Sequence, residues 1–133
     1  LIPDVGTLER ARLQEHLNYI ASELHKAFGP FFKASATDEQ RAQALETIPR
    51  HFDYLESLLD DGRAYLVGDT FTAADLIMAD VLRVDLVRKH GDRPASEAYV
   101  RRVTDRPAFR KAHADQLAHF AVADANREEK SDG

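Results

Sequence analysis

The chain has no cysteine and no tryptophan among its 133 residues. Without cysteine it cannot form a disulfide, a cysteine zinc site or a thiol nucleophile of its own, and this composition fits a reducing compartment. Long apolar runs are missing as well, because none approaches the roughly 18 residues that a membrane helix requires. No secretory signal is visible. We therefore expect no membrane partner.

Basic charge is also scarce. The 18 lysines and arginines are outnumbered by 23 aspartates and glutamates, which gives a net charge of −5. Because nucleic-acid binding needs a basic patch or stripe, we expect no nucleic-acid partner. The chain is 44% hydrophobic and 31% charged, which is typical of a globular protein, and its length fits a single domain.

Motifs of common catalytic sites are missing too. The sequence has no G-x-S-x-G elbow, no glycine loop for a phosphate and no H-E-x-x-H motif. No two of the six histidines are three or four residues apart, so no helix face offers a histidine pair to a metal ion. We assign no catalytic residue and no metal ligand in this chain.

Helical periodicity is the main pattern that the sequence does contain. A first helix is predicted over about residues 8–28, because apolar side chains recur on one face at steps of four, three, four and four. These side chains are Leu13, Leu17, Ile20, Leu24 and Phe28. Gly29 and Pro30 should end this helix. A second helix should begin at a capping box from Thr37 to Gln40, and Pro49 should kink or split it.

A second capping box precedes the most apolar stretch of the chain. Thr72 can cap the amide of Asp75, and the Asp75 side chain can reach back to the amide of Thr72. The helix that follows, to about Lys89, is apolar nearly all round, which predicts a buried helix. Because a buried helix end cannot rely on water, we interpret Asp75 as a structural residue rather than a catalytic one. Asp80 should be exposed or paired with Arg83.

The last part of the chain contains two shorter predicted helices. They begin near Pro94 and Pro107, because proline is favoured in the first turn of a helix. Residues 123–133 are polar and without pattern, and we expect a disordered tail there. The predicted fold class is all-α, a bundle of about five helices around a buried central helix, with residues 1–122 as one domain.

His25 and Lys26 stand near the end of the first predicted helix, next to aromatic residues. Adjacent helix residues point about 100° apart, so both can line one cleft only if the helix edge forms its wall. Two interpretations stay open. One is a partly buried histidine beside a solvated lysine. The other is a cationic corner for an anionic or thiolate-bearing ligand, with the aromatic residues forming an apolar pocket.

Three stretches of the sequence carry a family resemblance. Residues 17–32 are close to the pattern L-N-Y-I-x-x-E-L-H-K-x-F-x-P-L-F, residues 66–75 match G-x-x-F-[ST]-x-A-D, and residues 98–109 lead into R-P-x-[FV]. In these stretches the chain resembles the C-terminal helical domain of glutathione S-transferases, in particular the bacterial beta class. The likeness covers about residues 8–120, and its first stretch is specific to that class.

The resemblance implies a fold and a role. Such a domain supplies the wall of the second-substrate pocket and much of the homodimer interface in a cytoplasmic detoxification enzyme. The complete enzyme transfers glutathione, its co-substrate, to hydrophobic electrophiles. Its N-terminal thioredoxin-like domain binds glutathione and carries the catalytic serine, tyrosine or cysteine. That domain is absent from this chain, so we expect the chain alone to be inactive.

The resemblance also implies site residues. It places His25 and Lys26 next to glutathione, and Asn18 at a position that reaches glutathione across the dimer. It assigns four side chains to the hydrophobic substrate pocket: Phe28, Phe32, Ile77 and Val84. Beta-class enzymes commonly carry tyrosine where Ile77 stands and tryptophan where Val84 stands, so we expect a wider or reshaped pocket here.

A different function stays open beside the enzyme. Transferase-like helical domains also occur as non-catalytic protein-interaction modules in translation factors and synthetases, and the same pocket would serve a carrier of hydrophobic ligands. The capping motif and the buried helix fit all of these roles. His25, Lys26 and Asn18 favour the enzyme, because a scaffold does not need that set of residues. Conjugation, thiol–disulfide chemistry and reductive chemistry all remain open, as does the identity of the electrophile.

Overall fold

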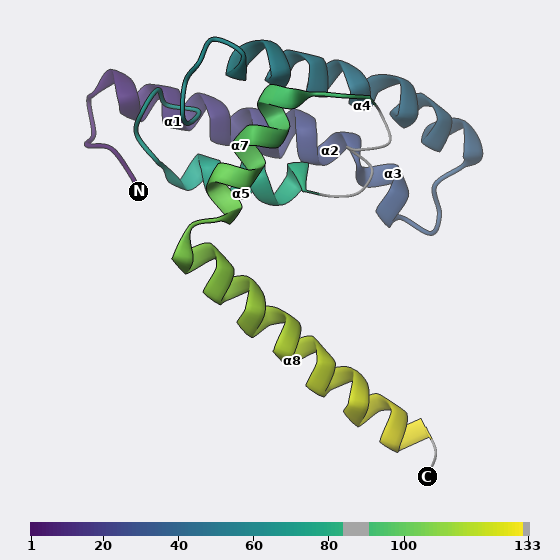
Figure 1. Ribbon diagram of the computed structural model, residues 1–133. Coiled ribbons are helices and arrows are strands. Elements are labelled where there is room, and N and C mark those ends of the chain that lie inside the picture. The colour runs from purple at the N-terminus through teal and green to yellow at the C-terminus, as the bar shows by residue number, and fades with distance from the viewer. Residues whose placement is uncertain (84–90, 132–133) are drawn as a thin grey trace. The chain divides into compact units, whose positions relative to one another are not determined.

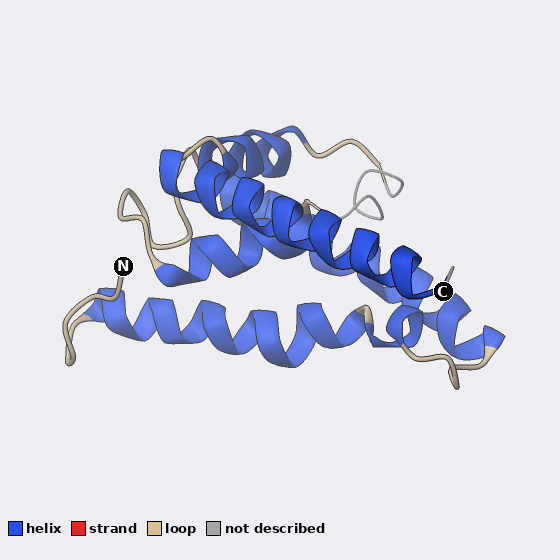
Figure 2. Cartoon of the chain, turned by 90° about the horizontal axis from the view of Figure 1, so that it is seen from below, coloured by secondary structure: helices blue, strands red, loops and turns tan. Residues whose placement is uncertain are grey.

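The computed structural model describes residues 1–83 and 91–131, and across these residues it contains helices and loops but no strand (Figures 1 and 2). The prediction of an all-α fold is confirmed. The chain divides into two compact units, Leu1–Val100 and Arg101–Gly133. In the described part of the chain, no helix is both long enough and apolar enough to cross a membrane.

Three consecutive segments form the first predicted helix. They are α1 (Leu8–Tyr19), the π-helical segment η1 (Ile20–Leu24) and α2 (His25–Ala27), which follow one another without a break (Figure 1). Thr7 caps the start of α1, because its Oγ1 accepts a hydrogen bond from the Arg10 amide at 3.2 Å. The sequence pattern did not predict the π-helical segment.

The π-helical segment explains which side chains of this helix are buried. They are Leu13, His16, Ile20, Leu24 and Phe28. From His16 onward each step is four residues, and in an α-helix each such step drifts by about 40° around the axis. The i→i+5 bonds of a π-helix widen the turn and offset this drift. His16 therefore takes the buried place that we predicted for Leu17, which is only half-buried.

A short turn and a long helix follow. α3 (Gly29–Phe32) has a proline in its first turn, so Gly29 and Pro30 begin a new helical turn directly after the first helix ends. α4 (Asp38–Leu59) begins at the predicted capping box. Its cap residue Thr37 accepts from the Gln40 amide at 3.2 Å, and Gln40 Oε1 accepts from the Thr37 amide at 2.9 Å. Pro49 lies inside α4 and does not split it.

The core of residues 1–100 lies between α4, the first helix and α5 (Ala73–Leu82). α2 and α3 lie against α4, and α1 packs beside α5. α4 contributes a buried row that consists of Ala44, Ile48, Phe52, Leu55 and Leu59. A turn connects α4 to α5, and Gly62 takes a φ of +89° there, a conformation that favours glycine.

α5 differs in part from the prediction of a helix buried all round. One face is buried, with Ala74, Asp75, Met78, Ala79 and Leu82. Ile77 is 45% exposed, because it stands on the opposite side from this buried face. Asp80 is exposed as well and pairs with Arg83, as predicted, with Arg83 Nε 2.7 Å from Asp80 Oδ1. The predicted continuation of this helix over residues 84–89 lies outside the described residues.

The last two helices begin where proline predicted them. α7 is Pro94–Thr104 and α8 is Pro107–Ser131. α8 continues through residues 123–131, where we expected a disordered tail, so that expectation was wrong for the local structure. Alanine, glutamate and lysine have high helix propensity, and Arg127 Nη1 lies 3.2 Å from Asp124 Oδ1 one turn earlier. A helix can therefore form here without an apolar stripe.

Candidate functional site

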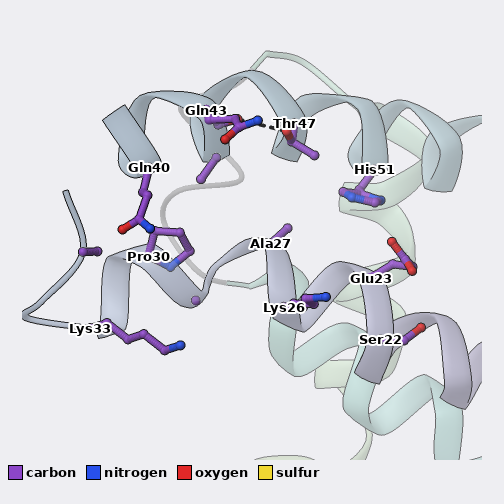
Figure 3. A pocket seen from close by; sticks show the side chains of 13 residues that line it. Ser22, Glu23, Lys26, Ala27, Pro30, Lys33, Gln40, Gln43, Thr47 and His51 are labelled. Carbon is purple, nitrogen blue, oxygen red and sulfur yellow. Dashed lines mark hydrogen bonds between the residues drawn. The ribbon is translucent and has the colours of Figure 1, made fainter. Parts of the chain in front are cut away.

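A polar groove lies between the segment from η1 to α3 and the helix α4 (Figure 3). Its volume is about 650 Å³, which is in the usual range for a small-molecule site. Its charged and titratable side chains are Glu23, Lys26, Lys33 and His51. We call it the Lys26 groove. Because one wall comes from residues 22–33 and the other from residues 36–51, the packing of two helices creates it.

Two lysines bring positive charge to one wall of the Lys26 groove. Lys26 lies in α2, and Lys33 follows the last residue of α3. Both side chains are exposed, and neither forms an ion pair within residues 1–83 and 91–127. Among the side chains that the structure describes, Glu23 is the only carboxylate that lines the groove. The groove therefore offers more positive than negative charge to a ligand.

His51 lines the opposite wall and is held from behind by Tyr19. The Tyr19 hydroxyl lies 2.7 Å from His51 Nδ1, and the two rings meet edge to face with centroids 5.8 Å apart. Burial raises the pKa of Tyr19 to about 12, and the neighbouring Tyr54 and Glu23 act in the same direction. The phenol thus keeps its proton at neutral pH. When it donates to Nδ1, the neutral imidazole carries its own proton on Nε2.

The residues predicted to contact glutathione take different positions. Lys26 lines the groove, whereas Asn18 and His25 are exposed residues of the same helical segment that do not line it. The Asn18 backbone carbonyl accepts a hydrogen bond from Ser22 Oγ at 2.7 Å, and Ser22 does line the groove. The structure brings Lys26 together with Lys33 and His51, which we did not predict.

The residues predicted to form a hydrophobic pocket differ in their exposure. Phe28 is buried in the core against Phe52, with ring centroids 6.1 Å apart. Phe32 is 73% exposed and Ile77 is 45% exposed. Val84 lies outside the described residues. Phe28 thus belongs to the core, and a pocket role for Phe32 and Ile77 stays a prediction.

Thr72 and Asp75 form the second capping box at the start of α5. The buried Asp75 carboxylate accepts four hydrogen bonds. Its Oδ2 accepts from the Thr72 amide at 2.8 Å and from Thr72 Oγ1 at 3.2 Å. Its Oδ1 accepts from the Leu66 amide at 2.9 Å and from the Tyr99 hydroxyl at 2.8 Å. Since all its acceptor capacity goes to the protein, the residue is structural.

Another carboxylate secures the start of α7. Glu56 on α4 accepts from the Ala95 amide at 2.9 Å, from the Ser96 amide at 2.8 Å and from Ser96 Oγ at 2.7 Å. Burial alone would raise the pKa of Glu56. The Ser96 hydroxyl, the two amides and the charge of Arg93 lower the pKa by more, so it lies below its ordinary value.

Sequence patterns missed most of the Lys26 groove. Lys33 and His51 belong to no recognised motif, and His51 is separated from its partner Tyr19 by 32 positions. Periodicity predicts which face of each helix is apolar, but it does not predict which two polar faces will meet. The family pattern contains Glu23, Lys26 and Pro30 among the lining residues, and we had assigned a ligand contact only to Lys26.

Comparison with known proteins gives consistent matches. The family model described as glutathione S-transferase, C-terminal domain, matches residues 12–113. The curated glutathione S-transferase GstA of Escherichia coli O157:H7 is 34% identical over 83 residues, which cover 62% of this chain and 41% of that protein. This chain therefore spans less than half the length of that relative.

Solved structures agree in fold. The glutathione transferase of Methylococcus capsulatus strain Bath has a TM-score of 0.76 and 36% identity, over 87% of this chain and 59% of that one. A sphingomonad glutathione S-transferase complexed with glutathione has a TM-score of 0.74 and 35% identity, over 84% of this chain and 56% of that one. The resemblance seen in the sequence is thereby confirmed, and the chain belongs to the glutathione S-transferase C-terminal domain family.

Proposed function

We propose that this chain is the helical domain of a glutathione transferase, in which it forms part of the substrate pocket and of a homodimer interface. The complete protein would transfer glutathione to hydrophobic electrophiles in the cytoplasm, as a detoxification enzyme does. The observation that carries this proposal is the likeness to transferases over 84–87% of the chain at 35–36% identity. One of those relatives is complexed with glutathione.

Lys26 is the residue of this chain that suits the reaction best. Its ammonium is exposed at the Lys26 groove and has no ion-pair partner in the described part of the chain. A cation there stabilises a glutathione thiolate or carboxylate. The family pattern also places His25 near glutathione, although His25 does not line the Lys26 groove. Because the site is open to solvent, we assign Lys26 a modest effect, and catalysis rests mainly on thiolate activation and proximity.

The test uses the full-length gene product that contains this chain. Conjugation of glutathione to 1-chloro-2,4-dinitrobenzene, followed by absorbance, should be saturable in glutathione. Lys26→Ala should raise the KM for glutathione about fivefold, the size expected of one exposed charge contact. Lys111→Ala is the matched control, because Lys111 is also exposed but pairs with Asp115 on α8. Absence of turnover would contradict the proposal.

The subunit interface has its own test. Sedimentation equilibrium of the same full-length product should give twice the mass of one chain. A monomer at micromolar concentration would contradict the interface role. It would leave the transferase activity to be judged by the turnover assay alone.

A further inference from the structure

Residues 63–67 form a short strap between α4 and α5, and a glycine with positive φ stands at each end of it. Gly62 has a φ of +89° and Gly68 has a φ of +62°, backbone values that other residues rarely adopt. Within the strap the chain closes on itself, because the Tyr65 amide donates to the Gly68 carbonyl at 2.8 Å. A compact turn of this kind can move as one unit, since the two glycines can absorb the change in backbone angles.

The strap is held in place at the Leu66 peptide. The Leu66 amide donates to Asp75 Oδ1 on α5 at 2.9 Å, and the Leu66 carbonyl accepts from Arg63 Nη1 at 3.1 Å. The ring of His16 on α1 also makes a polar contact with the Leu66 backbone. Leu66 is only 1% exposed and His16 only 6%, so these contacts are shielded from water. His16 thus connects the strap to α1.

A cavity of about 330 Å³ lies between the strap and the start of α1. Its α1 wall consists of Leu8, Glu9 and Arg12, and its other wall comes from residues 61, 63 and 66–68. Side chains therefore do not fill the space along this edge of the strap. With a cavity there instead of close packing, the strap depends more on its contact with His16.

The groups around His16 act on its protonation in both directions. Glu15 on the same helix and Asp75 on α5 favour the protonated ring, as does the Leu66 backbone, whereas Arg63 on the strap opposes it. Burial is the largest influence and opposes protonation, so the pKa of His16 lies below its ordinary 6.5 while the strap is in place. When the strap moves away, water reaches the ring and this penalty is relieved. A proton therefore binds more readily to the open arrangement than to the closed one.

We propose that residues 63–67 are an acid-sensitive strap, which a neutral His16 holds against α1 and a protonated His16 releases. Opening separates the Leu66 amide from Asp75 and enlarges the cavity at the start of α1. The change is local, because the buried row of α4 takes no part in the contact. Opening is rarest above about pH 6.5 and becomes more frequent as the pH falls below that value.

Hydrogen exchange of the full-length gene product, followed by mass spectrometry, tests this inference. Exchange is compared at about pH 7.5 and about pH 5.5, a range in which ordinary carboxylates keep their charge, and is corrected for intrinsic rates. The peptide that contains Leu66 should lose protection by about threefold or more at the lower pH, while peptides from α4 keep theirs. His16→Gln cannot take up a proton at this position and should abolish the difference. His119→Gln is the control and should respond as the wild type does, because His119 is exposed on α8.

Three outcomes would overturn the inference. The first is equal protection of the Leu66 peptide at both pH values in the wild type, a result that does not depend on any variant folding. The second is a loss of protection that persists in His16→Gln. The third is an equal loss in the α4 peptides, which would mean that acid unfolds the whole domain and does not release a strap.

Discussion

Asp75 connects parts of the chain that local sequence patterns treat separately. Its carboxylate accepts hydrogen bonds from Leu66, which precedes α5, from Thr72, which caps α5, and from Tyr99, which lies on α7. Hydrogen bonds to a charged group are stronger than neutral ones, and a buried donor left without its acceptor costs further free energy. The residue therefore contributes far more than an ordinary helix cap does.

Substitution of Asp75 tests this account. Asp75→Ala should lower the free energy of unfolding by about 3 kcal/mol or more, because it leaves several buried donors without an acceptor. Urea denaturation measures the loss. Asp80→Ala is the matched control on the same helix, since Asp80 is exposed and pairs only at the surface; its change should stay within about 0.5 kcal/mol. Lost turnover with unchanged stability would contradict the structural role.

The Tyr99 hydroxyl donates to the same carboxylate, and removing it gives a second test of the role of Asp75. Tyr99→Phe removes one donor but keeps the ring, so the free energy of unfolding should fall by about 1–2 kcal/mol. Thermal denaturation followed by circular dichroism gives the comparison with wild type. A loss as large as that of Asp75→Ala would mean that ring packing, and not the hydrogen bond, connects α7 to α5.

Residue-scale predictions from the sequence succeeded where partners are close in the chain. The partners of the box at Thr37 are three positions apart, and so are those of the box at Thr72, so a local pattern contains both partners. Tyr99 lies 24 positions from Asp75, and no local pattern contains that pair. For the same reason Lys26 was anticipated, whereas its companion His51 was not.

At the scale of elements, the start of α7 is capped by a residue of another helix, α4. Glu56 on α4 supplies the acceptors for the Ala95 and Ser96 amides that a helix start leaves unsatisfied. Arg93 strengthens the same junction, because Nη2 lies 2.8 Å from Asp53 Oδ1 and its guanidinium lies 5.4 Å from the Phe52 ring centroid. The start of α7 therefore depends on α4 remaining folded.

Removing this cap should have a local signature. Glu56→Ala should cost about 1–2 kcal/mol of stability, as loss of a helix cap does. Hydrogen exchange should show faster exchange at the amides of Ala95 and Ser96. Glu46→Ala, an exposed glutamate on the same helix, serves as control and should leave both amides protected. Unchanged exchange in Glu56→Ala would show that α7 is capped in another way.

The sequence predictions for the first helix and for the end of α8 differ from the structure. The pattern of α1 assumed a uniform α-helix, but the buried series that contains His16 is continuous only because η1 widens the turn. The end of α8 was expected to be disordered because it lacks an apolar stripe, although its residues have high helix propensity. Apolar periodicity indicates packing, and it carries less information about helices that form from propensity alone.

At the scale of the molecule, His16 and Glu56 both contribute to the sensitivity of folding to acid. Burial lowers the pKa of His16 below its ordinary 6.5, and hydrogen bonds lower the pKa of Glu56 below its ordinary 4.5. As the pH falls, the unfolded chain binds a proton at each of these groups at a higher pH than the folded chain does. Their contribution to stability is therefore fully present above about pH 6.5. The part from His16 is lost below that pH, and the part from Glu56 is lost below about pH 4.5.

A series of urea denaturations across pH tests the two steps. His16→Leu should remove the loss of stability that begins near pH 6.5, because a leucine cannot take up a proton. It should not change the loss of stability that begins near pH 4.5. His119→Leu is the control, since His119 is exposed on α8 and should not alter the profile. If the decline that begins near pH 6.5 persists in His16→Leu, then the buried histidine is not its source.

The π-helical segment has a consequence for how such a protein changes over evolutionary time. A π turn holds an additional residue compared with an α turn, so η1 is equivalent to an α-helix that has accepted an insertion. In a uniform α-helix, deletion of one residue would rotate everything after it by about 100°. Deletion of one residue between Ile20 and Leu24 would instead convert the π turn into an α turn, and Lys26 would keep its place at the groove. The segment therefore takes up the gain or loss of one codon without changing the direction of the side chains that follow.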